Sequence, residues 1–163
     1  MTDEMRTGIG LDFHRLSPGE SLVLGGAEFD HPKGTVAHSD GDVLVHAVCD
    51  AVLGAVGLGD IGEVFPDDDP AYKDVSSLKL LKEVTEMAAS EGFRPINVDT
   101  TLILQSPGVN SRRKEIEENV ERVLGAPVNL KATTTESMGF IGEEKGIGAQ
   151  AIALLGKKES KRE

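Results

Sequence analysis

The sequence predicts a single domain of the α/β or α+β class, built around one mixed β-sheet. The chain has 163 residues, which is the length of one domain and enough for a single core. Segments rich in β-branched residues are interspersed with segments of helical periodicity. Short hairpin-like connections and longer crossover connections both join them, so the strands should run in both directions. Periodicity alone does not decide between the two classes.

The composition excludes several classes of partner. The formal net charge of -11 argues against binding to nucleic acid or to anionic membranes, because both need basic patches. Cys49 is the only cysteine, so no intramolecular disulfide can form and a cytoplasmic location is expected. The N-terminal residues lack the apolar stretch of a signal peptide, and no segment approaches the length of a membrane span.

The first strands are expected at residues 7–13, 21–24 and 27–29. The last two should form a hairpin, because the pair Gly25 and Gly26 between them suits a tight turn. The first strand carries alternating residue types, so its odd and even positions should lie on opposite faces.

A helix is expected to begin near Ser39 or Asp40 and to run to about residue 56. The side-chain oxygens of these two residues can accept from the orphan amides of a first helical turn. Helical spacing predicts a polar face made of Asp42, His46 and Asp50. The opposite stripe is apolar and should be buried, and consists of Val43, Ala47, Val48, Ala51 and Val52.

The second half of the chain reads as alternating helices and strands. Residues 57–73 are rich in glycine, proline and carboxylates, which predicts a long loop that either covers a substrate or is an acidic, solvated turn. Helices should run from Ser76 or Ser77 to a stop at Gly92, and over 111–124. Strands are expected at 96–104, 128–133 and 147–155. Within a single domain of residues 1–163, segments 1–6 and 157–163 should be flexible termini.

Asp12, His14 and His46 predict a metal site. Alternation along the first strand places Asp12 and His14 on one face, and the helix adds His46. One carboxylate and two imidazoles suit zinc and leave its fourth tetrahedral position open for substrate or water. The alternatives are a solvated strand end and a satisfied surface histidine.

Two stretches could hold phosphate. The amides and the dipole at the start of the helix favour an anion beside His38 and Ser39. The run Thr133-Thr134-Thr135-Glu136 offers hydroxyls for phosphate oxygens and a carboxylate for a Mg²⁺ that bridges two phosphates. The threonines could equally reflect β-propensity alone.

Five motifs occur in order along the chain: Gly10-Leu11-Asp12-Phe13-His14; Ala37-His38-Ser39-Asp40-Gly41-Asp42 with His46; Gly59-Asp60-Ile61-Gly62; Phe65-Pro66-Asp67; and Lys131-Ala132-Thr133-Thr134-Thr135-Glu136. Together they make residues 7–155 resemble the 2-C-methyl-D-erythritol 2,4-cyclodiphosphate synthase family, enzymes of the non-mevalonate isoprenoid pathway. Five ordered motifs form a specific pattern, which strengthens the metal reading.

The resemblance implies a reaction and an assembly. The substrate would be 4-diphosphocytidyl-2-C-methyl-D-erythritol 2-phosphate, converted into the cyclic diphosphate with release of CMP by a phosphorus-oxygen lyase. The sheet would be covered by helices on one face. Three chains would form a homotrimer with active sites between subunits.

The resemblance also implies residue roles. Zinc would be held by Asp12, His14 and His46, and Mg²⁺ or Mn²⁺ by Glu136. His38 would place the reacting phosphate, and Thr134 would steady the transition state. The other substrate contacts would be Asp12, His14, Ser39, Asp60, Ile61, Gly62, Phe65, Pro66, Asp67, Asp68, Asp69, Thr135 and Phe140. The neighbouring subunit's cytidine pocket would comprise Leu104, Gln105, Ser106, Pro107, Gly108, Val109, Asn110, Ala132, Thr133 and Thr134.

Two positions depart from the pattern of the family. Gly108 stands where a lysine near the nucleotide phosphate is frequent, so that contact is lost, supplied by backbone or replaced by a residue such as Arg112. Glu143 and Lys145 reverse the usual order of an arginine followed by an acid. Glu143 would therefore repel an isoprenoid diphosphate along the trimer axis.

Two other functions stay open at this point. A zinc-dependent phosphoester hydrolase would use water at the open metal position. A metal-stabilised oligomer without catalysis would fill that position with a protein ligand, and Cys49, three residues past His46, is poorly placed to be one. The products separate the first alternative from cyclisation, because hydrolysis releases inorganic phosphate.

Overall fold

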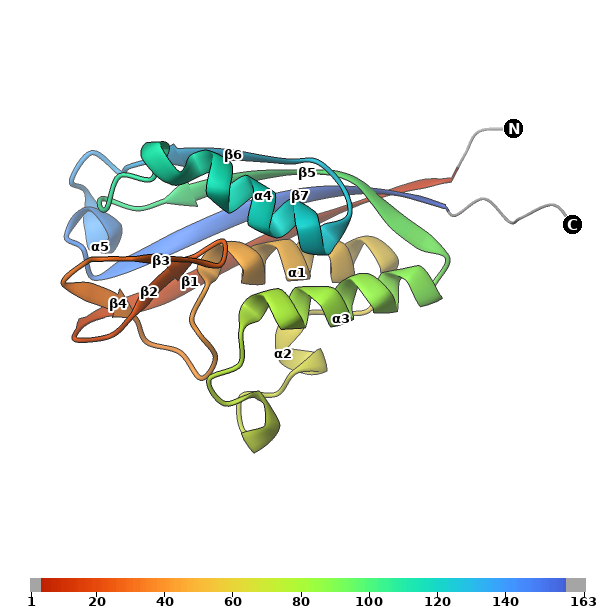
Figure 1. Ribbon diagram of the computed structural model, residues 1–163, viewed down its shortest axis with the longest axis horizontal. Coiled ribbons are helices and arrows are strands. Elements are labelled where there is room, and N and C mark those ends of the chain that lie inside the picture. The colour runs from red at the N-terminus through yellow and green to blue at the C-terminus, as the bar shows by residue number, and fades with distance from the viewer. Residues whose placement is uncertain (1–3, 158–163) are drawn as a thin grey trace, which may run out of the picture.

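A five-stranded mixed sheet organises the computed structural model, which describes residues 4–157 (Figure 1). The strand order is β4-β1-β7-β5-β6, and only β5 and β6 pair in parallel. The single mixed sheet expected from the sequence is therefore confirmed. Its strands are β1 (Met5–Pro18), β4 (Lys33–Thr35), β5 (Phe93–Ile103), β6 (Val128–Thr133) and β7 (Gly146–Lys157).

The expected hairpin forms a separate two-stranded sheet. Strands β2 (Leu22–Leu24) and β3 (Ala27–Phe29) pair antiparallel around Gly25 and Gly26. Both glycines have positive φ, 57° and 72°, which glycine adopts without the steric penalty of a Cβ atom.

Helices cover one face of the five-stranded sheet (Figure 1). Helix α1 packs on β1 and β7, α3 packs on α1, and α4 packs beside β6. No helix among residues 4–157 is long and apolar enough to cross a membrane. The helices are α1 (Val43–Val56), α2 (Ile61–Val64), α3 (Ser77–Ser90), α4 (Arg113–Leu124) and α5 (Gly139–Gly142), with 3-10 turns η1 (Pro70–Tyr72) and η2 (Asn110–Arg112).

The polar face predicted for α1 is wrong. The helix is buried on nearly all sides, and Asp42 and His46 are only 0% and 8% exposed. The helix begins at Val43. Its N-cap is Asp42, instead of Ser39 or Asp40. Because the Asp42 side chain accepts from the amide of Val45, that amide is not free for the anion expected beside His38.

Asp42 joins the start of α1 to the β2–β3 turn. Its Oδ1 accepts from the Gly25 amide at 2.9 Å, and its Oδ2 accepts from the Gly26 amide at 2.7 Å. Burial raises the pKa of Asp42 to about 6, although these amides oppose the rise and the nearby Asp40 adds to it.

This raised pKa predicts a pH-dependent stability. The folded pKa of about 6 lies above the ordinary value of 3.8, so between these values the folded chain binds a proton that the unfolded chain does not. The contribution is complete below pH 3.8, reaches about 3 kcal/mol there, and is lost as pH rises through about 6. Chemical denaturation at several pH values should therefore show wild type gaining stability over Asp42→Asn between about pH 7 and pH 5. A difference that does not change with pH would contradict the assignment.

Two glycines let α1 approach β1 closely. A Cβ atom on Gly8 would lie 1.9 Å from the carbonyl oxygen of Ala51, and one on Gly10 would lie 1.8 Å from that of Ala47. Larger side chains would push the helix away from the strand. Asp12 lies on the same face of β1 as Gly8 and Gly10, two residues after Gly10. The close approach therefore brings Asp12 against α1, the helix that carries His46.

The opposite face of the sheet carries exposed apolar side chains. Ile9, Leu11 and Phe13 of β1 are 58%, 51% and 51% exposed, and Ile152 of β7 is 48% exposed. Such a contiguous row is typical of a surface that meets another protein.

The structure adds regular elements that the sequence patterns do not predict. The expected 57–73 loop contains α2, which Asp60 caps by accepting from the Glu63 amide, and η1. Residues 5, 6 and 157 lie in strands and not in the flexible termini that we expected. Residues 1–3 and 158–163 of those termini lie outside the described residues.

Candidate functional site

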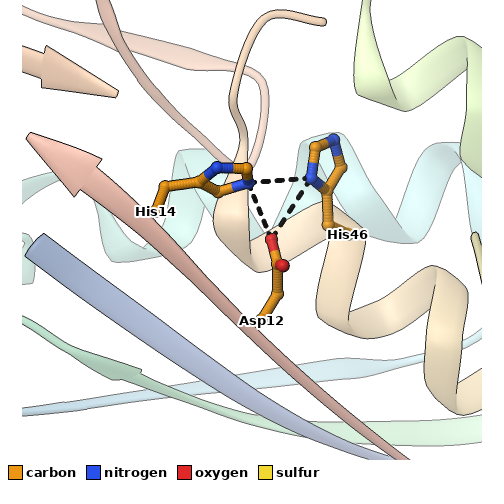
Figure 2. A group of neighbouring side chains, drawn as sticks. All are labelled: Asp12, His14 and His46. Carbon is orange, nitrogen blue, oxygen red and sulfur yellow. Dashed lines mark hydrogen bonds and ion pairs between the residues drawn. The ribbon is translucent and has the colours of Figure 1, made fainter. Parts of the chain in front are cut away.

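Asp12, His14 and His46 converge as the sequence predicts (Figure 2). The Oδ2 atom of Asp12 lies 2.8 Å from Nε2 of His14 and 3.2 Å from Nδ1 of His46. The two imidazole nitrogens lie 3.1 Å apart. Two side chains come from β1 and one from α1, so the packing of the helix on the strand assembles the group.

This donor set fits a divalent metal. In a tetrahedral zinc site with bonds of about 2.0–2.2 Å, the ligand atoms lie roughly 3.3–3.6 Å from one another. The three candidate ligand atoms lie 2.8–3.2 Å from one another, so a small outward shift would accommodate zinc. Nitrogen and carboxylate donors suit zinc and neighbouring transition metals. Among residues 4–157, no other group of three His, Cys, Asp or Glu side chains has this arrangement.

Mutual charge shapes the protonation of the group. Burial raises the pKa of Asp12, but the hydrogen bonds and charges of His14 and His46 outweigh burial and lower it overall. Burial lowers the pKa of His46, but the hydrogen bond and charge of Asp12, together with the charges of Asp42 and Asp40, outweigh burial and raise it. Asp12 is therefore ionised and available as an anionic ligand, and a metal cation would replace the proton that the group otherwise attracts.

A cavity of about 270 Å³ opens beside these ligands. It brings together residues from β1, the loop before α1, α1 itself and the segment around α2. The predicted site residues that line it are Asp12, His14, His38, Ser39, His46, Ile61, Gly62, Phe65 and Asp67. Sequence reasoning missed four others, Val36, Ala37, Tyr72 and Leu80.

Four predicted contacts lie in the same segment without lining this cavity, namely Asp60, Pro66, Asp68 and Asp69. The Asp69 side chain caps η1. The backbone carbonyl oxygen of Asp69 accepts from Nε2 of His38 at 3.2 Å. The backbone of His38 also accepts from the amide of Asp74 at 2.9 Å. These bonds hold the His38 loop against the segment that precedes α3.

A second cavity of about 170 Å³ is lined by most of the residues predicted for the nucleotide pocket. It shares no lining residue with the first cavity. Its lining comes from the loop after β5 and the end of β6: Leu104, Gln105, Pro107, Gly108, Val109, Asn110, Ala132, Thr133 and Thr134.

Besides Asp60, Pro66, Asp68 and Asp69, four more predicted residues lie outside both linings: Ser106, Thr135, Glu136 and Phe140. Ser106 bonds Glu144 and His31, and the Thr135 hydroxyl donates to the Met138 carbonyl at 2.6 Å. Glu136 is exposed, and its amide donates to Thr134 Oγ1 at 3.1 Å.

Arg112, the residue suggested as a replacement for a lysine at Gly108, is held by other partners. Its guanidinium pairs with Glu115 at 2.8 Å, donates to the Glu28 carbonyl and lies 4.7 Å over the Phe29 ring. It does not line the second cavity. The option that Arg112 contacts the nucleotide phosphate would require breaking these bonds.

The outer partners of His46 were also missed. Ser77 at the start of α3 lies 2.8 Å from Nε2 of His46, and Ser77 in turn bonds Asp40. For Asp40, the sequence pattern predicts only a possible cap of α1. Its contact with a residue 37 positions away depends on the fold.

The chain matches the model of the YgbB family over residues 5–156. It is 51% identical over 154 residues to a 2-C-methyl-D-erythritol 2,4-cyclodiphosphate synthase of Syntrophomonas wolfei, across 93% of this chain and 98% of that protein.

Solved structures share the fold. The bifunctional IspDF from Campylobacter jejuni aligns with a TM-score of 0.93 and 38% identity, over 99% of this chain and 44% of that longer one. A CDP complex of IspF from Plasmodium falciparum aligns with a TM-score of 0.84 and 32% identity, over 98% of this chain and 100% of that one.

Proposed function

Because the chain belongs to the YgbB family, we propose that it is a 2-C-methyl-D-erythritol 2,4-cyclodiphosphate synthase. It converts 4-diphosphocytidyl-2-C-methyl-D-erythritol 2-phosphate into the cyclic diphosphate and CMP, as a phosphorus-oxygen lyase of isoprenoid precursor synthesis. A cytoplasmic location belongs to the same proposal and rests on the single, buried cysteine.

The observation that carries the proposal is the group of three ligand atoms at the edge of the first cavity. Asp12, His14 and His46 would hold zinc, and Glu136 would hold Mg²⁺ or Mn²⁺ together with the substrate diphosphate. When bound, such ions neutralise charge on phosphate oxygens and orient them.

The protein's own task is alignment. An oxygen of the 2-phosphate is already an anionic nucleophile, so its attack on the β-phosphorus needs no strong general base. The new phosphorus-oxygen bond forms as the bond to the CMP oxygen breaks, and CMP leaves with that electron pair. His38 and Ser39 would bind the reacting phosphate in line with its target, and positioning of this kind supplies much of the rate enhancement.

The methylerythritol part would lie against Ile61, Gly62 and the Phe65 to Asp69 segment, which border or adjoin the first cavity. The cytidine would enter the second cavity, where Thr134 would steady the charge that develops in the transition state. Gly108 would offer only backbone to the nucleotide phosphate.

A homotrimer would unite the two cavities across subunits. The two have no lining residue in common, and the uncovered sheet face exposes apolar side chains that association would bury, among them Ile9, Leu11 and Phe13. Each active site would then combine the metal group of one subunit with the nucleotide pocket of its neighbour.

Phosphorus NMR tests the reaction directly. With the cytidyl substrate, zinc-loaded protein and Mg²⁺, the spectrum should show cyclic diphosphate and CMP in equal amounts, and a chelator should abolish both. Inorganic phosphate as the main product would instead identify a zinc-dependent phosphoester hydrolase, the alternative that an open metal position favours. Heat-denatured protein under the same conditions is the control.

A further inference from the structure

We propose that Asp40 and Ser77 act as positioning residues that hold His46 in the tautomer whose Nδ1 is free to bind the metal. The inference rests on the metal centre of the proposed function and deepens it. It concerns side chains that do not border the first cavity.

The two ring nitrogens of His46 face different partners. Nδ1 faces Asp12 at 3.2 Å and His14 at 3.1 Å, inside the group of candidate ligands. Nε2 points away from that group, toward Ser77 Oγ at 2.8 Å and Ser39 Oγ at 3.2 Å. A neutral imidazole carries one proton, so the partners of Nε2 determine whether Nδ1 offers a lone pair.

The hydroxyl proton of Ser77 is already committed to Asp40. Oγ of Ser77 donates to Asp40 Oδ1, an oxygen that also accepts from the Asp42 amide. A serine has no second hydroxyl proton to offer. The oxygen that faces His46 therefore presents a lone pair, and a contact of 2.8 Å to a nitrogen requires that Nε2 carry the proton.

Asp40 is itself fixed as an acceptor. Its Oδ1 also accepts from the Asp42 amide at 3.1 Å, and its Oδ2 accepts from the Ser77 amide at 2.9 Å. Two backbone donors and one hydroxyl thus converge on the carboxylate, so both of its oxygens act as acceptors. Its orientation is set by the backbone just before α1 and at the start of α3.

Burial protects the hydrogen-bonded path from Asp40 through Ser77 to His46, here called the relay, from water. Ser77 is 0% exposed and His46 is 8% exposed, so few water molecules compete for these bonds. Ser39 lies farther from Nε2, and its oxygen accepts from the Gly41 amide at 3.3 Å. Because Ser39 is the more distant of the two hydroxyls, it can turn toward substrate while Ser77 holds the His46 imidazole in place.

The relay gives His46 the organisation that metal-binding histidines usually have, with the outer nitrogen bonded to a fixed acceptor. The path from Asp40 through Ser77 to His46 orients the ring, selects the tautomer and raises the basicity of Nδ1. Without it, Nδ1 could carry the proton and donate it to Asp12, which would block the metal position.

Ser77→Ala tests this relay, with Ser76→Ala as its matched control. Both variants remove one hydroxyl at the start of α3, but the Ser76 side chain makes no capping bond. Zinc affinity measured by competition with a chromophoric chelator should fall about 10–100-fold in Ser77→Ala and stay at the wild-type value in Ser76→Ala. Asp40→Asn should weaken zinc in the same direction. Circular dichroism checks the fold of each variant.

Nitrogen-15 NMR of the imidazoles gives a readout that does not depend on any variant. In metal-free wild type at about pH 9, where imidazole is neutral, His46 should carry its proton on Nε2. A proton on Nδ1, or wild-type zinc affinity in folded Ser77→Ala, would overturn the relay and leave the metal centre standing. Wild type that binds no zinc would overturn the metal centre and the relay with it.

Discussion

His46→Ala is expected to lose both zinc binding and cyclisation, whereas His38→Ala should keep zinc and lose only turnover. Removing His46 leaves two ligands, Asp12 and His14, and its effect on zinc affinity should exceed the roughly 10–100-fold typical of an outer partner. His38 lines the same cavity but does not belong to the ligand group. Its loss should lower kcat/KM by about 10²–10³, the usual effect of removing one stabilising donor.

The measurements are zinc content after dialysis and CMP release by each variant. His46 is buried and bonded to Ser77, so its removal also leaves a small cavity and an unpaired partner, which costs roughly 1–3 kcal/mol of stability. Thermal unfolding identifies that part of the effect. Full activity in metal-depleted His46→Ala would refute the zinc assignment, and zinc loss in folded His38→Ala would contradict the separation of His38 from the ligand group.

The metal group illustrates what local sequence patterns can predict. Alternation along a strand needs only the period of two, so it places Asp12 and His14 on one face correctly. The helix pattern adds His46 as a candidate, but a lone helical histidine has many possible roles, and the resemblance strengthened this assignment. The fold supplies the missing reason, because Gly8 and Gly10 let α1 lie close enough to β1 to bring the ligands together.

The face of α1 illustrates what such patterns miss. Asp42 and His46 look like a solvated face because polar residues at helical spacing usually are one. Both are buried, and each has internal partners that replace water: Gly25 and Gly26 for Asp42, and Ser77 for His46. Those partners lie 16 to 31 positions away, so no periodicity within the helix could identify them.

The short elements of the 57–73 segment were missed for a different reason. Helix α2 has four residues and η1 has three, which is too short for a periodic signal. Their caps, Asp60 and Asp69, are aspartates in a stretch full of carboxylates, where capping and solvation look alike in sequence.

A mixture of His46→Ala and Thr134→Ala subunits should recover activity that neither variant has alone. The expectation follows from the proposed trimer, in which each active site joins the metal group of one subunit to the Thr134 pocket of the next. A Thr134→Ala subunit still donates His46, and a neighbouring His46→Ala subunit still donates Thr134. Such a pair forms one site with every essential residue present.

The fraction of activity recovered follows from random mixing of the two variants. After co-refolding in equal amounts, random mixing gives each position an even chance of either variant, so about one site in four is intact in a head-to-tail ring. Activity near a quarter of wild type, with mixed trimers seen by native mass spectrometry, would support shared sites. Two His46→Ala preparations mixed in the same way are the control and should stay inactive. Mixed trimers as inactive as their parents would mean that His46 and Thr134 serve a site within one chain, and the exposed apolar row on the sheet would then need another partner.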